Sequence, residues 1–202
     1  MVNHPSYRQS IVWKGKTYSP MQFRDYLSEK LLEIDMEEWE RDIFSFGWEW
    51  MNDQKQEFEI QTSGSTSKPK IILHSREAMI NRALATGKAL QLQVGDSALL
   101  CLPAKYIAGK MMIVRALVLG LNLYYEQSNI PIIETVNRTY DFCALIPLQI
   151  QYAIDHHLEK KLNQLHTIIV GGAKLAEEYI EPLNKLKNKV FATYGMTETI
   201  TH

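Results

Sequence analysis

Hydroxyl, glycine and lysine residues gather in one short stretch of the sequence, from Thr62 to Lys70. Phosphate oxygens accept hydrogen bonds from hydroxyls and backbone amides, and a nearby ammonium group offsets their negative charge. Gly64 allows a tight turn and a close approach to a ligand, and Pro69 stiffens the exit. The stretch therefore predicts a loop that binds a polyphosphate through Thr62, Ser63, Gly64, Ser65, Thr66, Ser67, Lys68 and Lys70.

Two other interpretations of this loop must be weighed. A solvated hairpin loop has the same composition, and it stays open for the loop considered alone. A Walker P-loop requires Gly-x-x-x-x-Gly-Lys-Ser/Thr, but Pro69 stands where the second glycine would have to follow Gly64. The Walker type of nucleotide site is therefore excluded.

A pair of glycines, Gly171 and Gly172, comes with Ala173 directly after the apolar run 167–170. In a parallel α/β sheet, ligands bind outside the carboxyl ends of the strands. Without side chains, the two glycines allow a flat ring to come close to the backbone. A strand-to-helix turn that needs a positive φ would have the same sequence, so both interpretations stay open.

A second set of polar residues, from Tyr194 to Thr199, follows the apolar run 189–193. Tyr194 offers a face for a nucleobase, Gly195 allows close approach and Thr197 supplies a hydroxyl. Glu198 offers a hard oxygen ligand of the kind that Mg²⁺ prefers. Taken alone, the stretch also fits an ordinary turn.

Together and in this order, the three stretches resemble the signature elements of the adenylate-forming enzymes, which include acyl-CoA synthetases and luciferases. The loop is similar to Thr-Ser-Gly-Ser/Thr-Thr-Gly-x-Pro-Lys, and it departs at Ser67, where the family usually has glycine. Ile71 stands where another glycine is common. Tyr194 to Glu198 matches Tyr-Gly-x-Thr-Glu at every fixed position.

The resemblance implies an ATP-dependent acid–CoA ligase that uses ATP, Mg²⁺, CoA and a small carboxylic acid. The carboxylate attacks the α-phosphorus, which gives an acyl-adenylate and pyrophosphate. The loop 62–70 would hold the β- and γ-phosphates, and the glycine pair with Ala173 would border the adenine and the acyl pocket. The implied catalytic residues are Lys70, Thr197 and Glu198; Tyr194 and Gly195 would adjoin the adenine, Thr197 the α-phosphate, and Glu198 the metal.

A further segment, 102–110, is similar to the family's Pro-Leu-Phe-His-x-x-Gly element, which borders the acyl substrate. The resemblance implies substrate contacts at Tyr106, Gly109 and Lys110, although Tyr106 replaces the usual histidine. Lys105 or Lys110 could attract a substrate carboxylate, and each could equally be a solvated lysine near the start of a helix.

Within the family, the early position of the loop and the sequence Tyr-Gly-Met-Thr-Glu-Thr look like the o-succinylbenzoate–CoA ligases of menaquinone biosynthesis. Two alternatives stay open: a ligase for another aryl or short-chain acid, and a nucleotide-binding module that has lost the chemistry. The family continues beyond these elements with a ribose-binding aspartate and a lid domain that carries a lysine. We therefore expect residues 1–202 to form an incomplete N-terminal AMP-binding domain with little ligase activity of its own.

The elements that must position these residues follow from hydrophobic periodicity. A hairpin is expected at 11–18, and helices are expected at 20–34, 37–52, 75–90, 110–119, 147–160 and 175–187. Strands are expected at 58–62, 71–73, 98–102, 121–125, 141–146, 167–170 and 189–193. Strands that alternate with helices predict a layered αβα fold with a mainly parallel sheet.

Composition limits the class of protein. The net charge of −1 leaves no electrostatic footprint for nucleic acid, and the most apolar run is too short for a membrane span. Two cysteines in apolar settings predict small buried residues in a reducing compartment. We therefore expect a cytoplasmic protein that binds neither nucleic acid nor membrane, and the family resemblance implies that a homodimer can form.

Overall fold

The computed structural model describes residues 6–62 and 70–193 of the chain. Its strands are β1 (Ile11–Trp13), β2 (Lys16–Tyr18), β3 (Glu57–Gln61), β4 (Ile71–Ser75), β5 (Ser97–Leu100), β6 (Asn122–Tyr125), β7 (Tyr140–Leu145), β8 (Leu165–Val170) and β9 (Lys189–Ala192). Its helices are α1 (Pro20–Leu31), α2 (Glu38–Trp50), α3 (Arg76–Leu90), α4 (Ile107–Leu119), α5 (Ile132–Thr135), α6 (Pro147–Asp155), α7 (Glu159–Leu162) and α8 (Ile180–Asn184), with a 3-10 turn, η1 (Glu177–Tyr179). None of the helices in these two ranges is long and apolar enough to cross a bilayer.

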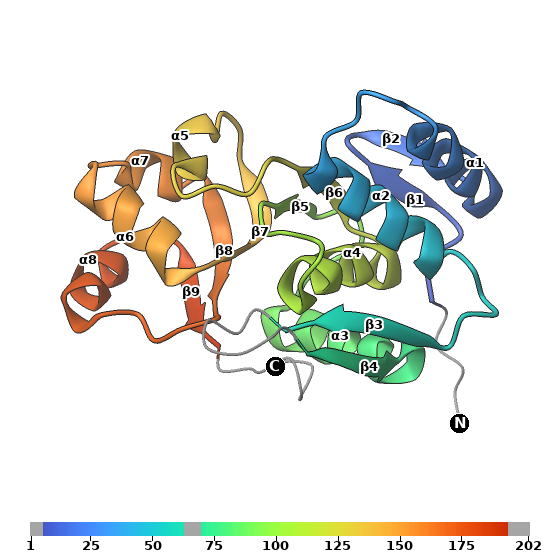
Figure 1. Cartoon of the computed structure of the whole chain (residues 1–202). Helices are drawn as coiled ribbons and strands as arrows, with labels where there is room; N and C mark the ends of the chain where they lie inside the picture. The colour runs from blue at the N-terminus through green and yellow to red at the C-terminus, as the bar shows by residue number, and fades with distance from the viewer. Residues whose placement is uncertain (1–5, 63–69, 194–202) are drawn as a thin grey trace.

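A seven-stranded sheet in the order β2-β1-β6-β5-β7-β8-β9 forms the middle of the molecule (Figure 1). β1 and β2 are antiparallel, and the other described pairings within this sheet are parallel. The carboxyl ends of β5, β7, β8 and β9 therefore lie along one edge. The prediction of a mainly parallel sheet is confirmed.

Helices cover both faces of this sheet. Ala98 and Leu100 of β5 pack into a core with α1 to α4, whereas Leu99 lies on the opposite face in a core with α5 to α8. This alternation is the period of a strand that is buried on both faces. The layered αβα fold expected from the sequence is thereby confirmed.

β3 and β4 form a separate antiparallel two-stranded sheet. Alternate residues, among them Phe58 and Ile60, are buried in the core with α2 and α3. The expected strands 58–62 and 71–73 therefore exist, and β4 continues two residues farther, to Ser75. The side chain of Ser75 then accepts a hydrogen bond from Ala78 N at 3.2 Å and caps α3, at the start of the helix expected at 75–90.

Several helix predictions need correction. The helix expected at 20–34 ends at Leu31, α4 begins at residue 107 rather than 110, and α5 was not anticipated. The helix expected at 147–160 is two helices, because the chain turns at His157, which has a φ of 57°. The helix expected at 175–187 shrinks to η1 and α8, because Pro182 can occupy the first turn of a helix but not its interior.

The aromatic residues of α2 mainly fill the core. Phe44, Phe46 and Trp50 are buried, whereas Trp48 is 43% exposed. The three buried rings therefore serve as core packing and do not line a ligand groove. Cys101 and Cys143 are also buried, as expected for small apolar residues; their thiols share a hydrogen bond at 3.7 Å and form no disulfide.

Candidate functional site

The base of the Thr62–Lys70 loop is closed by hydrogen bonds between its two ends. Thr62 N donates to Lys70 O at 2.9 Å, and Lys70 N donates to Thr62 Oγ1 at 3.1 Å. The Thr62 hydroxyl thus serves as an acceptor at the neck, and its proton is free to donate to a ligand. The predicted phosphate-binding residues Ser63, Gly64, Ser65, Thr66, Ser67 and Lys68 lie outside the described residues.

The neck of the loop adjoins the segment that follows β5. Gln61, at the end of β3, makes a parallel bridge with Tyr106, which is the N-cap residue of α4. Tyr106 N donates in turn to Pro103 O at 3.2 Å. The structure therefore brings the end of β3, which leads into the predicted phosphate loop, next to the predicted 102–110 segment, although the two are far apart in the sequence.

Lys105 and Lys110 have different surroundings. Lys105 is exposed, whereas Lys110 is partly buried, with its Nζ 4.5 Å from the centroid of the Phe46 ring. Burial lowers the pKa of Lys110, and the carboxylates of Glu49 and Asp42 oppose this shift. Lys110 is therefore held against α2, and the alternative of a freely solvated lysine fits Lys105 only.

Gly109 lies in the first turn of α4, where the structure leaves no room for a side chain. A Cβ at this position would lie 2.4 Å from Pro103 O and 2.8 Å from Ala104 Cα. Both are backbone atoms, so the helix or the segment after β5 would have to move. The sequence placed Gly109 in a loop beside the substrate; the structure places it in a helix packed against that loop.

We expect Gly109→Ala to lower the free energy of unfolding by about 2 kcal/mol, because the added methyl group overpacks a backbone contact. Urea denaturation followed by circular dichroism measures the change. Ala108→Ser, at the neighbouring exposed position, is the control and should stay within about 0.5 kcal/mol of the parent chain. Equal stability of Gly109→Ala and the parent would contradict the packing role.

The glycine pair after β8 adopts the turn that the sequence left open. Gly172 has a φ of 93°, and Gly171 N donates to Leu145 O at 3.1 Å. A Cβ on Gly172 would meet only Ile146 Cγ2, at 3.8 Å. Gly172 therefore provides the positive φ of a turn and also leaves open space beside its backbone. A turn at this position is thus compatible with the close approach of a flat ring.

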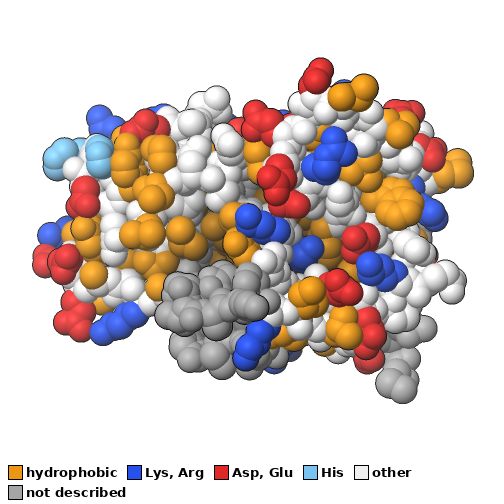
Figure 2. Space-filling model, in the orientation of Figure 1, with side chains coloured by type: hydrophobic (Ala, Val, Ile, Leu, Met, Phe, Trp, Pro, Cys, Tyr) orange, Lys and Arg blue, Asp and Glu red, His pale blue; other side chains and the backbone are white. Residues whose placement is uncertain are grey.

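A cavity of about 600 Å³ opens beside this turn. Its walls are mostly apolar and come from β8, β9 and α8; the lining residues are Val170, Gly172, Ala173, Lys174, Leu175, Ile180, Leu183, Asn184, Val190, Ala192 and Thr193. Figure 2 shows hydrophobic side chains gathered over the half of the molecule where α6 and α8 lie in Figure 1. The cavity is thus at the carboxyl ends of parallel strands, where such folds bind ligands.

Thr193 ties the end of β9 to β8 at the mouth of this cavity. Its backbone N and its Oγ1 both donate to Val170 O, at 2.8 Å and 3.0 Å. Tyr194 follows directly in the sequence. The predicted residues Tyr194, Gly195, Thr197 and Glu198 lie outside the described residues, and no cluster of three metal-ligating side chains occurs within the described ranges.

Gln149 is a positioning residue that the sequence reasoning missed. It is 1% exposed, and its Nε2 donates to Cys101 O at 3.3 Å and to Asn129 O at 3.0 Å. Its Oε1 accepts from Ile146 N at 3.0 Å. Gln149 therefore joins the carboxyl ends of β5 and β7. The sequence held one signal that could have identified Gln149. Pro147 stands at the first helical position and glutamine follows two residues later, which is the pattern of a helix start.

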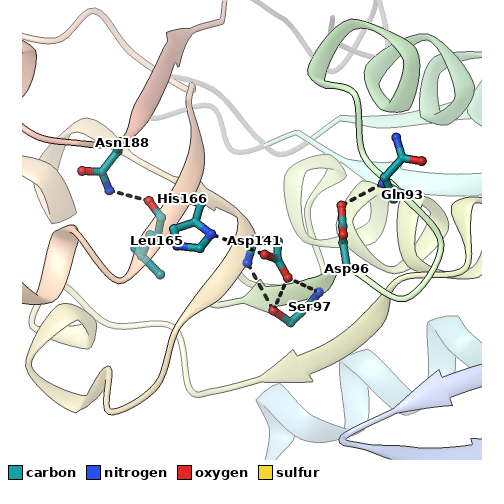
Figure 3. Close-up of polar contacts among 7 residues, drawn as sticks. All are labelled: Gln93, Asp96, Ser97, Asp141, Leu165, His166 and Asn188. Carbon is teal, nitrogen blue, oxygen red and sulfur yellow. Dashed lines mark hydrogen bonds and ion pairs between the residues drawn. The ribbon is translucent and has the colours of Figure 1, made fainter.

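A serine, an aspartate and a histidine meet at the opposite edge of the sheet (Figure 3). Asp141 Oδ2 accepts from Ser97 N at 2.8 Å and from Ser97 Oγ at 2.7 Å, and His166 Nδ1 lies 3.3 Å from Asp141 Oδ1. A catalytic triad requires the histidine between the other two residues. Here the aspartate is in the middle, so the cluster links the amino ends of β5, β7 and β8 and is not a nucleophilic site.

The stability contributed by Asp141 should depend on pH. Burial raises its pKa, but the hydrogen bonds from Ser97 and His166 outweigh burial and lower the pKa below 3.8. A lowered carboxyl pKa stabilises the fold above the unfolded-state value, and that stability is lost as the pH falls through the folded-state value. We expect Asp141→Asn to cost about 1 kcal/mol at pH 7, because the group is partly exposed.

The difference between Asp141→Asn and the parent should shrink as the pH is lowered from 7 towards 3, in urea denaturation at each pH. Asp25→Asn, an exposed position on α1, serves as the control. A deficit for Asp141→Asn that stays constant down to pH 3 would rule out the ionised carboxylate as the cause.

Comparison with known proteins places the chain in a family. The family model for AMP-binding enzymes matches residues 58–202, well over half of the chain. The chain is 28% identical over 141 residues to the 2-succinylbenzoate–CoA ligase of Haemophilus influenzae, covering 68% of this chain and 30% of that ligase. The corresponding ligase of Staphylococcus aureus is 26% identical over 141 residues, and the match spans 28% of its length.

Solved structures show the same fold. An acyl-CoA synthetase (AMP-forming)/AMP-acid ligase II-like protein from Dyadobacter fermentans superposes with a TM-score of 0.77 and 32% identity, over 86% of this chain and 50% of that one. O-succinylbenzoate coenzyme A synthetase from Bacillus subtilis, solved with ATP and a magnesium ion, gives a TM-score of 0.59 and 21% identity over 70% of this chain and 30% of that one. The chain therefore belongs to the family of AMP-binding enzymes.

Proposed function

We propose that this chain is the ATP-binding N-terminal part of an ATP-dependent acid–CoA ligase whose acid is o-succinylbenzoate. The cavity at the carboxyl ends of β8 and β9 carries the proposal, because it offers an apolar slot beside Gly172, directly before Tyr194. The curated relatives named 2-succinylbenzoate–CoA ligase support the choice of acid. The chain spans less than a third of their length, so the activity of a whole ligase is part of the proposal.

The described residues fit the base of ATP. The apolar walls suit the faces of a purine ring, and the missing Cβ of Gly172 leaves space for the ring edge. In the proposal, Gly171, Gly172 and Ala173 border the adenine, and Tyr194 packs on it. Thr62 to Lys70 hold the β- and γ-phosphates, and the hydrogen bonds between Thr62 and Lys70 close the base of this loop.

The chemistry needs charge neutralisation and alignment more than a covalent nucleophile. The substrate carboxylate attacks the α-phosphorus, the bond to the β-phosphate oxygen breaks, and pyrophosphate leaves with the electron pair. Lys70 and Thr197 stabilise the negative charge that develops on the phosphate oxygens. Glu198 would hold Mg²⁺, which supplies further charge neutralisation when it is bound.

The acid is expected to approach along the 102–110 segment, past Tyr106. Lys105 is the exposed cation of that segment that could attract a carboxylate, because Lys110 is directed towards Phe46. CoA would bind mostly outside this chain. The location that we propose is the cytoplasm, where ATP and CoA are available.

Two measurements test this function. Isothermal titration calorimetry on the 202-residue chain should detect ATP binding, while pyrophosphate release by the chain alone should be slight. The longest reading frame that contains the chain should release pyrophosphate with ATP, Mg²⁺ and o-succinylbenzoate, and not with benzoate or a short fatty acid. Pyrophosphate release with a different acid would keep the proposed mechanism and replace o-succinylbenzoate as the proposed substrate. ATP binding without release from any acid would instead favour a non-catalytic nucleotide-binding module.

A further inference from the structure

The carboxamide of Gln149, on α6, is held in one orientation by three backbone partners. Its Nε2 donates to Cys101 O at 3.3 Å and to Asn129 O at 3.0 Å. Its Oε1 accepts from Ile146 N at 3.0 Å. Exchanging the amide oxygen and nitrogen would turn the oxygen towards two carbonyl oxygens and the N–H groups towards another N–H. Because the side chain is 1% exposed, water is not at hand to replace these partners, and the observed orientation is fixed.

The three partners lie in connections that follow three neighbouring strands. Cys101 comes directly after β5, Asn129 lies between β6 and α5, and Ile146 lies between β7 and α6. The strand order β6-β5-β7-β8 places β7 between β5 and β8. Gln149 therefore fastens the connection after β7 to the start of the 102–110 segment, along which the acid is proposed to approach.

The connection after β7 also supports the glycine turn after β8. Leu145 O accepts from Gly171 N at 3.1 Å. The Cγ2 atom of Ile146 lies 3.8 Å from the position that a Cβ on Gly172 would take. The backbone that Gln149 holds at Ile146 thus lies between the proposed acid segment and the proposed nucleotide turn.

We propose that Gln149 is the positioning residue that sets the separation of these two parts of the site, and so aligns the carboxylate with the α-phosphorus. This inference rests on the proposed function, which places the acid along 102–110 and the base of ATP beside Gly172. Gln149 is buried and is not one of the residues that line the cavity, so it acts through the backbone of Cys101 and Ile146. A misplacement of about 1 Å costs up to about 100-fold in the rate of such a reaction.

The experiment measures the rate of pyrophosphate release in a single turnover by the longest reading frame that contains the chain. ATP, Mg²⁺ and the acid that the parent accepts are varied up to saturation. The rate is expressed per ATP-binding site, counted by isothermal titration calorimetry, so that an unfolded fraction does not lower it.

Two variants remove the hydrogen bonds in different ways. Gln149→Met keeps the length of the side chain and loses all three bonds, whereas Gln149→Glu keeps the acceptor for Ile146 N and loses at least one of the two donors. Each variant should lower the saturated rate by about tenfold or more. The half-saturating concentrations of ATP and acid should stay within about threefold of the parent, because Gln149 touches neither ligand.

Ile150→Val is the matched control. Ile150 is the next residue of α6 and is fully buried in the core with α5 to α8, so the loss of a methylene destabilises the same helix without removing a hydrogen bond of Gln149. Its saturated rate per binding site should stay within about twofold of the parent.

Parent rates in both Gln149 variants, or an equal fall in Ile150→Val, would overturn the positioning role and leave the proposed function standing. A loss that appears only as weaker binding of ATP or acid would also overturn it. Failure of the parent frame to release pyrophosphate with o-succinylbenzoate, benzoate or a short fatty acid would overturn the proposed function and this inference together.

Discussion

Replacing Arg76 by methionine is expected to lower the free energy of unfolding by about 4 kcal/mol. Arg76 is 4% exposed, and its guanidinium donates to three backbone carbonyls: Trp50 O at 2.9 Å, Asn52 O at 2.8 Å and Lys55 O at 2.8 Å. It also lies 4.6 Å from the Trp50 ring centroid. Methionine keeps the aliphatic stem but leaves these carbonyls without their donor, and that loss is the main cost.

Urea denaturation followed by tryptophan fluorescence measures the effect. Arg82→Met is the control, because Arg82 is an exposed residue on the same helix, and it should change stability by less than about 0.5 kcal/mol. Arg76→Lys should fall between the two, since a lysine retains the charge but cannot reach all three carbonyls. A loss below 1 kcal/mol in Arg76→Met would show that water replaces the guanidinium at little cost.

Replacing Arg115 by methionine should instead raise the free energy of unfolding. Arg115 is 1% exposed within α4, its Nη1 contacts Met112 Sδ at 3.9 Å, and its Nε and Nη2 have no partner among the described residues. Burial lowers its pKa from 12.5 to about 10. This depression corresponds to about 3 kcal/mol of destabilisation by the charged form, so Arg115→Met should raise stability by an amount of that order.

The stabilisation expected for Arg115→Met should depend on pH, which can be checked. For a base with a lowered folded-state pKa, the unfolded chain binds more protons between the two pKa values, and stability therefore rises with pH above about 10. The advantage of Arg115→Met should accordingly be largest at neutral pH and shrink above pH 10. Arg82→Met is again the control. A destabilised Arg115→Met variant would instead reveal an anionic partner for the guanidinium.

These two arginines show what the sequence can predict and what it cannot. Both occur within stretches that the sequence correctly predicted as helical, and nothing in their local sequence distinguishes them. Arg76 is satisfied by carbonyls at the end of α2 and in the segment that follows it, more than 20 residues earlier in the chain. Arg115 meets a sulfur atom one helical turn away. Their opposite expected effects follow from which backbone atoms the tertiary structure brings to each guanidinium.

Local features were determined by the sequence alone, because their physics involves only neighbouring residues. Lys14 and Gly15 adopt the positive φ values, 48° and 78°, of a two-residue hairpin turn. Ser19 and Ser75 cap α1 and α3, at the starts of the helices expected at 20–34 and 75–90. The order of the candidate site elements, the alternation of strands and helices and the mainly parallel sheet were likewise readable from periodicity and resemblance.

The tertiary structure alone decided how these pieces meet. Hydrophobic period indicates that a strand is buried but not which strand it pairs with, so the separation of β3 and β4 from the main sheet could not be foreseen. The bridge between Gln61 and Tyr106, the reach of Gln149 to Cys101 O and the cavity that Asn184 lines all join residues distant in the sequence. Such contacts depend on packing geometry in three dimensions, which a linear pattern of residues does not specify.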